Sequence, residues 1–119
     1  MKKFLILLSL LNDCSAGAIQ EISPSELKQG DLILDVRTPE EHEMTALAQK
    51  HWLVPLDQLN AARFVQEHKL DGSKPLYILC RSGKRAKIAA EQFKKAGFKK
   101  AVVIRGGIIA AEKNGLKIR

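Results

Sequence analysis

Cys80 joins an apolar, strand-like run to a short cationic loop, and this pattern carries the clearest chemical meaning in the chain. The run is Tyr77-Ile78-Leu79, and the loop reads Arg81-Ser82-Gly83-Lys84-Arg85. Cysteine reacts as a thiolate, which backbone N–H groups and positive side chains stabilise. Because residues 86–93 have helical apolar spacing, we expect Cys80 at a strand-to-helix junction. There a thiolate and a site for a small anion would coincide.

The 119-residue chain is long enough for one domain, in which strand patterns alternate with helix patterns. We expect strands over 19–22, 32–36, 52–54, 76–79 and 101–104. We expect helical segments over 23–30, from 38 onward, and over 56–59, 62–70, 84–95 and 106–115. The alternation predicts an α/β fold with a mainly parallel five-stranded sheet flanked by helices on both faces. Ligands bind such sheets beyond the carboxyl ends of the strands, where Asp35-Val36-Arg37, Cys80 and Arg105-Gly106-Gly107 all fall.

The first 18 residues have the pattern of a cleaved secretory signal. Met1-Lys2-Lys3 is a cationic start, Phe4 to Leu11 is apolar except for Ser9, and Ala16-Gly17-Ala18 supplies the small residues that signal peptidase reads. The apolar run is shorter than the roughly 20 residues that span a bilayer. The sequence therefore predicts a signal peptide over 1–18, a mature domain over 19–119 without stable membrane insertion, and a periplasmic or secreted location. An N-terminal helix in a cytoplasmic protein is the alternative.

Cleavage after Ala18 would remove Cys14 and leave Cys80 as the single cysteine of the mature chain. In an oxidising compartment structural cysteines come in pairs, so a single one is either buried and inert or reactive. The cations around Cys80 favour reactivity. The mature chain would keep 18 basic and 12 acidic side chains, a formal charge of +6. Since no aromatic stacking platforms accompany the basic clusters, we expect small anions rather than nucleic acid as partners.

Three segments together resemble the single-domain rhodaneses. They are Leu34-Asp35-Val36-Arg37-Thr38-Pro39-Glu40-Glu41, Cys80-Arg81-Ser82-Gly83-Lys84-Arg85, and Gly106-Gly107-Ile108 with Gly115-Leu116 after it. Two segments depart from that family. A Gly-His-Ile-x-Gly-Ala segment usually precedes the third strand, where this chain has Ala46-Leu47-Ala48-Gln49-Lys50-His51. Ala110-Ala111 stands where an aromatic residue often follows the double glycine.

The resemblance implies a thiosulfate sulfurtransferase that works through a persulfide on Cys80. The thiolate would take the outer sulfur of an anionic donor such as thiosulfate and pass it to cyanide, a thiol or a protein acceptor. The loop Arg81-Ser82-Gly83-Lys84-Arg85 would surround the sulfur with backbone N–H groups. Gly83 would allow the tight curvature. Arg81, Lys84 and Arg85 would attract the donor, and the sequence does not rank them.

Asp35 and Arg37 are expected to support the site rather than to react. Asp35 ends a buried strand, and buried charges are rarely left unpaired. The resemblance implies that it holds the cysteine loop or the neighbouring strand ends, and that Arg37 pairs with Asp35 or with an acidic residue such as Glu41. His42, His51 and His68 lack metal-ligand spacing, and we interpret His42 as a solvated helical side chain. No metal and no cofactor are expected.

Three alternative functions remain. A cysteine phosphatase or arsenate reductase would need an arginine six places after the cysteine, where this chain has Ala86, with Arg85 one place too early. A catalytically idle rhodanese-like binding module would usually lack the cysteine or its cationic loop, and both are present here. The third alternative is a sulfur relay, with Cys80 as the carrier and a protein as acceptor. The sequence does not distinguish such a relay from a free-standing enzyme.

Overall fold

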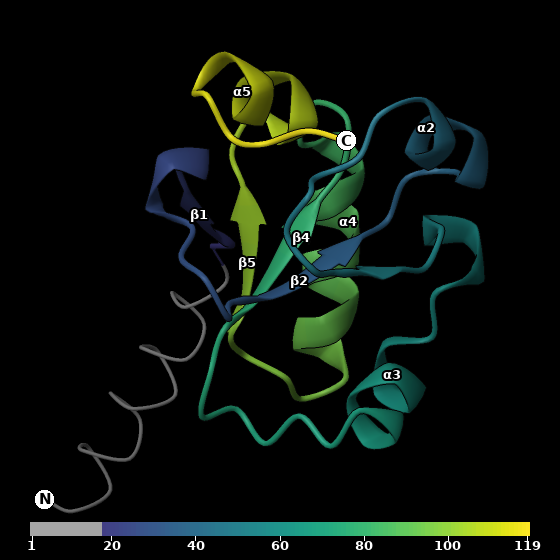
Figure 1. Cartoon of the computed structure of the whole chain (residues 1–119). Coiled ribbons are helices and arrows are strands. Elements are labelled where there is room, and N and C mark those ends of the chain that lie inside the picture. Colours follow the sequence, from purple (N-terminus) through teal and green to yellow (C-terminus); the bar gives the residue numbers. More distant parts are fainter. Residues whose placement is uncertain (1–17) are drawn as a thin grey trace, which may run out of the picture.

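A five-stranded, entirely parallel sheet forms the centre of the molecule in the computed structural model, which describes residues 18–119 (Figure 1). The strands are β1 (Gln20–Ile22), β2 (Leu32–Asp35), β3 (Trp52–Leu53), β4 (Leu76–Leu79) and β5 (Ala101–Ile104). Their order in the sheet is β1-β5-β4-β2-β3. The predicted α/β fold is therefore confirmed, and β4, which leads to Cys80, is the middle strand.

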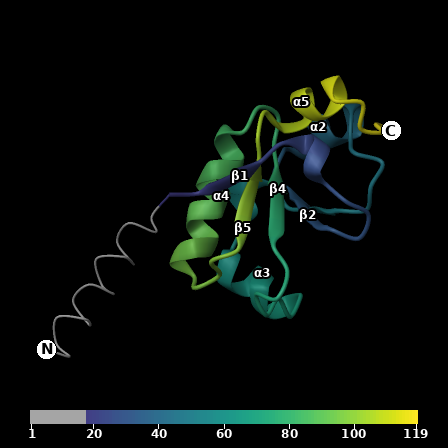
Figure 2. The same ribbon diagram turned by 90° about the vertical axis from the view of Figure 1, so that its left-hand side faces the viewer.

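Helices cover both faces of the sheet (Figures 1 and 2). Successive side chains of a strand point to opposite faces. On β4, Leu76 and Ile78 pack with the α3 and α4 side, whereas Leu79 packs with Ile108 and Ala111 of α5 on the other side. Cys80 continues the pattern of Leu76 and Ile78, so its side chain faces α4.

The helices are α2 (Pro39–Met44), α3 (Ala61–Glu67), α4 (Lys84–Lys95) and α5 (Gly107–Lys113), with 3₁₀ turns η1 (Pro24–Glu26) and η2 (Leu56–Gln58). Capping boxes at Ser23 and Thr38 start η1 and α2. The expected helix over 23–30 is wrong, however, because η1 is a single turn. At Leu27 the chain is already extended, and the Leu27 side chain packs against the α5 core.

The segment between α2 and β3, which departs from the family pattern, is held by the C-terminal residues. Leu47 forms an antiparallel bridge with Ile118, and Ala46 exchanges backbone hydrogen bonds with Arg119. Ala46 and Leu47 are buried by this pairing. The entry to β3 is therefore set by contacts 71 residues apart in sequence.

The predicted signal segment lies almost wholly outside the described residues, as does Cys14. Within residues 18–119, no helix is both long enough and apolar enough to cross a bilayer.

Candidate active site

Cys80 directly follows β4, and three residues separate it from Lys84, where α4 begins. The backbone N–H of Gly83 donates a hydrogen bond of 2.9 Å to the Cys80 sulfur. Gly83 has φ +118°, in the left-handed region that favours glycine, and this curvature turns its N–H back toward the sulfur. The cysteine is 1% exposed. The sulfur therefore lies at the floor of a tight loop, which we call the cysteine loop (residues 80–85), beside the first turn of a 12-residue helix.

The double glycine after β5 packs directly against the cysteine loop. Gly107 has φ +62°, and a side chain there would collide with the backbone carbonyl groups of Cys80 and Arg81. The N–H of Ile108 donates to the Cys80 carbonyl at 2.9 Å, and that of Ile109 to the Arg81 carbonyl at 3.3 Å. The start of α5 thus fixes the backbone of the cysteine, which explains why a motif 26 residues away belongs to the same site.

The three cations of the cysteine loop have different surroundings. Arg85 forms a two-pronged ion pair with Glu41 of α2, at 2.7 and 2.8 Å. This pairing raises the pKa of Arg85 and lowers the pKa of Glu41 from 4.5 to about 2. Arg81 and Lys84 are exposed, and neither forms an ion pair with any residue in 18–119. The sequence did not predict that Glu41 would pair with Arg85.

Asp35 and Arg37 form a fully buried ion pair beside the end of β4. The Arg37 guanidinium bonds both carboxylate oxygens at 2.9–3.1 Å, and its backbone N–H donates to the same carboxylate. The guanidinium also donates to the carbonyl groups of Glu41 and Thr45, at 3.2 and 2.6 Å. The pair therefore ties the end of β2 to α2. The supporting role is consistent with this geometry, but within the described residues the Asp35 carboxylate bonds only Arg37 and does not hold the cysteine loop itself.

The carboxyl ends of β2, β4 and β5 thus meet at one edge of the sheet, as predicted. The Arg105 side chain does not join the cysteine loop, because it forms an ion pair of 3.2 Å with Glu21. Ser82, Gly83, Lys84 and Gly106 line a shallow hollow next to that ion pair.

A comparison with known protein families identifies the family of this chain. The rhodanese-like domain matches residues 22–113, which include strands β2 to β5, the cysteine loop and the double glycine. The chain belongs to the rhodanese-like domain family. The family assignment supports sulfur transfer as its general chemistry.

Individual rhodanese-like relatives agree with this assignment. Protein YrkF of Bacillus subtilis (strain 168), whose name describes it as a candidate sulfur carrier protein, is 34% identical over 101 residues. That match covers 79% of this chain but only 51% of YrkF, so the chain spans about half the length of this relative. A rhodanese-like domain protein from Staphylococcus aureus is 26% identical with a TM-score of 0.64, covering 85% of this chain and 99% of that one.

A solved rhodanese-like domain from the Anabaena sp. protein Alr3790 shows the same fold at lower identity. Its TM-score is 0.71 at 17% identity, over 86% of this chain and 80% of that chain. Similarity at this level shows the fold alone.

The sequence did not predict the surroundings of the histidines. His42 lies on α2, a helix, as expected, but it is partly buried rather than solvated, and its Nε2 lies 2.8 Å from Nε2 of His51. Burial and the neighbouring His51 lower the pKa of His42. The two residues are nine positions apart on either side of an irregular segment, so no periodic spacing could have shown their contact. His68, in contrast, stacks against Trp52 and Phe64.

Proposed function

We propose that this protein is a sulfurtransferase that carries one sulfane sulfur atom on Cys80. The observation that carries the proposal is the short cysteine loop, in which the Gly83 N–H contacts the Cys80 sulfur. A loop this tight surrounds a single sulfur atom. It would stabilise the negative charge of a thiolate and, one atom further out, of a persulfide.

The reaction would proceed in two displacement steps. The Cys80 thiolate attacks the outer sulfur of thiosulfate, and a new S–S bond forms on Cys80. The S–S bond of thiosulfate breaks, and its electron pair leaves with sulfite. A nucleophile such as cyanide or a thiolate then attacks the outer sulfur of the persulfide and removes it, which regenerates the Cys80 thiolate.

Two cations are available to attract the anionic donor. Arg81 and Lys84 are exposed near Cys80, whereas Arg85 is held by Glu41. We therefore assign donor attraction to Arg81 and Lys84. The assigned role of Arg85 is to keep a fixed positive charge beside the Cys80 sulfur, since its ion pair limits how far it can move.

The arrangement argues against the phosphatase alternative. A phosphatase loop must enclose a whole tetrahedral oxyanion, with an arginine directed into it. Here the position that would carry that arginine is Ala86, which is fully buried, and the nearby Arg85 points to Glu41. Hydrolysis of an aryl phosphate by the wild-type protein would contradict this reasoning.

The test is turnover of thiosulfate and cyanide to thiocyanate by the wild type and by Cys80→Ser. We expect measurable thiocyanate from the wild type and none from the variant. If both were equally inactive and thiosulfate added no sulfur to the wild type, the chain would be an idle binding module instead.

A sulfur relay to a protein acceptor is the second candidate, and the similarity to YrkF favours it. A relay would load Cys80 with sulfur from thiosulfate yet form thiocyanate slowly. Loading without turnover would therefore distinguish a relay from a free-standing enzyme.

We also propose that the protein is exported and cleaved after Ala18. Cleavage there would leave every described strand and helix in place, since β1 begins at Gln20. A periplasmic or secreted location follows from this proposal. The mass of the protein recovered from cells tests it, because a chain that still begins at Met1 would contradict export by this route.

A further inference from the structure

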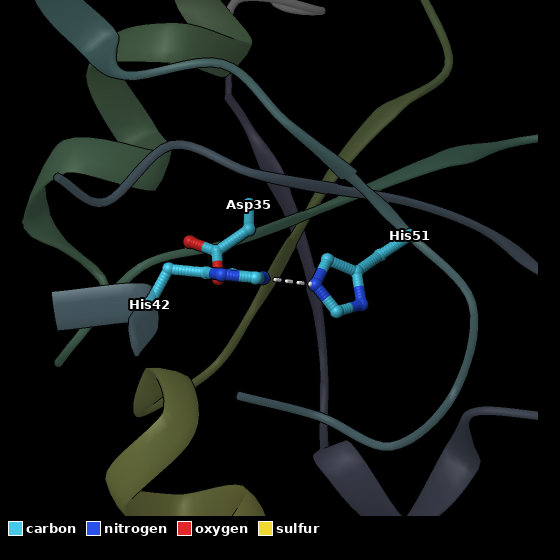
Figure 3. Close-up of side chains that lie close together, drawn as sticks. All are labelled: Asp35, His42 and His51. Atoms are coloured by element: carbon cyan, nitrogen blue, oxygen red, sulfur yellow. Dashed lines mark hydrogen bonds between the residues drawn. The ribbon is translucent and has the colours of Figure 1, made fainter. Parts of the chain in front are cut away.

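Two histidine side chains point at each other beside the buried Asp35–Arg37 pair (Figure 3). His42 comes from the last turn of α2 and His51 from the residue just before β3. Their Nε2 atoms are 2.8 Å apart, and an Asp35 carboxylate oxygen lies within 4.8 Å of a ring nitrogen of each histidine. Both histidines are partly exposed, so a small solute can reach them.

The partners of each ring bear on which of the two facing nitrogens offers a lone pair. Nδ1 of His51 is 2.7 Å from the carbonyl oxygen of Gln49, which can only accept, so the proton of neutral His51 is on Nδ1 and its Nε2 carries a lone pair. Arg119, which can only donate, lies 3.4 Å from Nε2 of His42. His42 Nε2 therefore either donates a proton to His51 Nε2 or faces it with a second lone pair, and in the second arrangement a cation between the two nitrogens removes their repulsion.

We propose that His42 and His51 bind a divalent transition-metal cation of the zinc class through their Nε2 atoms. Imidazole nitrogen is a common ligand for such ions. The hydrogen bond from Nδ1 of His51 to a backbone carbonyl is the support that metal-binding histidines typically have. The four lone-pair directions of Asp35 are already used by Arg37, so Asp35 supplies negative charge next to the ion, and water completes the coordination.

Only a small movement is needed to admit the ion. Two nitrogens on a tetrahedral zinc ion, each about 2.0–2.1 Å from the metal, are about 3.3 Å apart. The present separation is 2.8 Å. His51 lies in a loop rather than within a regular element, so its ring can withdraw by this amount. The ion would then fasten the end of α2 to the start of β3.

The test uses the full chain without an affinity tag, with Cys14→Ser and Cys80→Ser to remove both thiols, which are competing zinc ligands. Calorimetric titration with Zn²⁺ should show one ion per chain and a rise in melting temperature. His42→Gln and His51→Gln should each weaken binding about tenfold or more. His68→Gln is the matched control, because that ring stacks on Trp52 instead, and it should leave binding unchanged.

A second measurement does not depend on whether the variants fold. Cu²⁺ bound to the thiol-free parent should give an electron paramagnetic resonance spectrum with splitting from two imidazole nitrogens. If the parent bound no zinc, or bound it equally well in all three histidine variants, the proposal would be wrong. In that case the pair is a hydrogen bond in which His42 Nε2 carries the proton.

Discussion

Replacing Glu41 by glutamine tests how the ion pair with Arg85 stabilises the site. Glu41 also belongs to the capping box of Thr38, and glutamine serves equally well at that position. The substitution therefore removes the charge and leaves the cap. At this position the effect of losing the ion pair can be measured without the effect of losing the helix cap.

The size of the effect follows from the pKa of Glu41, which Arg85 lowers from 4.5 to about 2. That change corresponds to about 3.4 kcal/mol at most. The two side chains are 27% and 31% exposed, so solvent screens the pair, and part of the change comes from Thr38. We expect Glu41→Gln to lower the free energy of unfolding by about 1–2 kcal/mol at pH 7.

The pH dependence has a definite sign. Because the pKa of Glu41 is lower in the folded protein, its stabilisation is complete above pH 4.5 and disappears as the pH falls toward 2. The stability difference between wild type and variant should therefore shrink from pH 7 to pH 3. Urea denaturation followed by the fluorescence of Trp52, the single tryptophan, measures it.

Two controls make this result decisive. Glu43→Gln, an exposed carboxylate on the same helix, should change stability little at either pH. In an Arg85→Gln background, Glu41→Gln should lose most of its effect. A stability difference that stays the same from pH 7 to pH 3 would refute the assignment of this energy to the ion pair.

Three further predictions follow. Asp35→Asn leaves Arg37 as a buried, uncompensated charge, so it should lower the free energy of unfolding by about 3–5 kcal/mol in urea denaturation, and a loss below about 1 kcal/mol would contradict this. Gly107→Ala should destabilise the fold more than Gly115→Ala, since both have positive φ but only the first would collide with the cysteine loop. Equal melting temperatures for the two would argue against that packing. Lys84→Gln should raise the KM for thiosulfate about two- to fivefold with little change in kcat, and an unchanged KM would exclude a role in attracting the donor.

The sequence predicted most of the fold because its local signals agree with one another. The buried strands are apolar runs in the sequence, and helix α4 starts at Lys84, as expected. The helix expected after Ser23 failed for a tertiary reason. Leu27 packs into the core beneath α5, and this contact favours an extended chain over further helical turns.

The cysteine loop and its strand-end neighbours were also predictable, since parallel strands bring their carboxyl ends to one edge. The partners of the charged side chains were not predictable from the sequence. Whether the Glu41 carboxylate pairs with Arg37 or with Arg85 depends on how α2 packs, and the His42–His51 contact depends on an irregular segment held by the C-terminal residues. Such contacts leave no periodic signal in the sequence.

The central claim is that Cys80 carries sulfur, and the mass of the intact protein tests it most directly. After incubation with thiosulfate and removal of the excess, the wild-type protein should gain the mass of one sulfur atom, and fragmentation should place it on Cys80. Cyanide should remove that mass again, and Cys80→Ser should never acquire it. A wild-type protein whose mass does not change under these conditions would contradict the account.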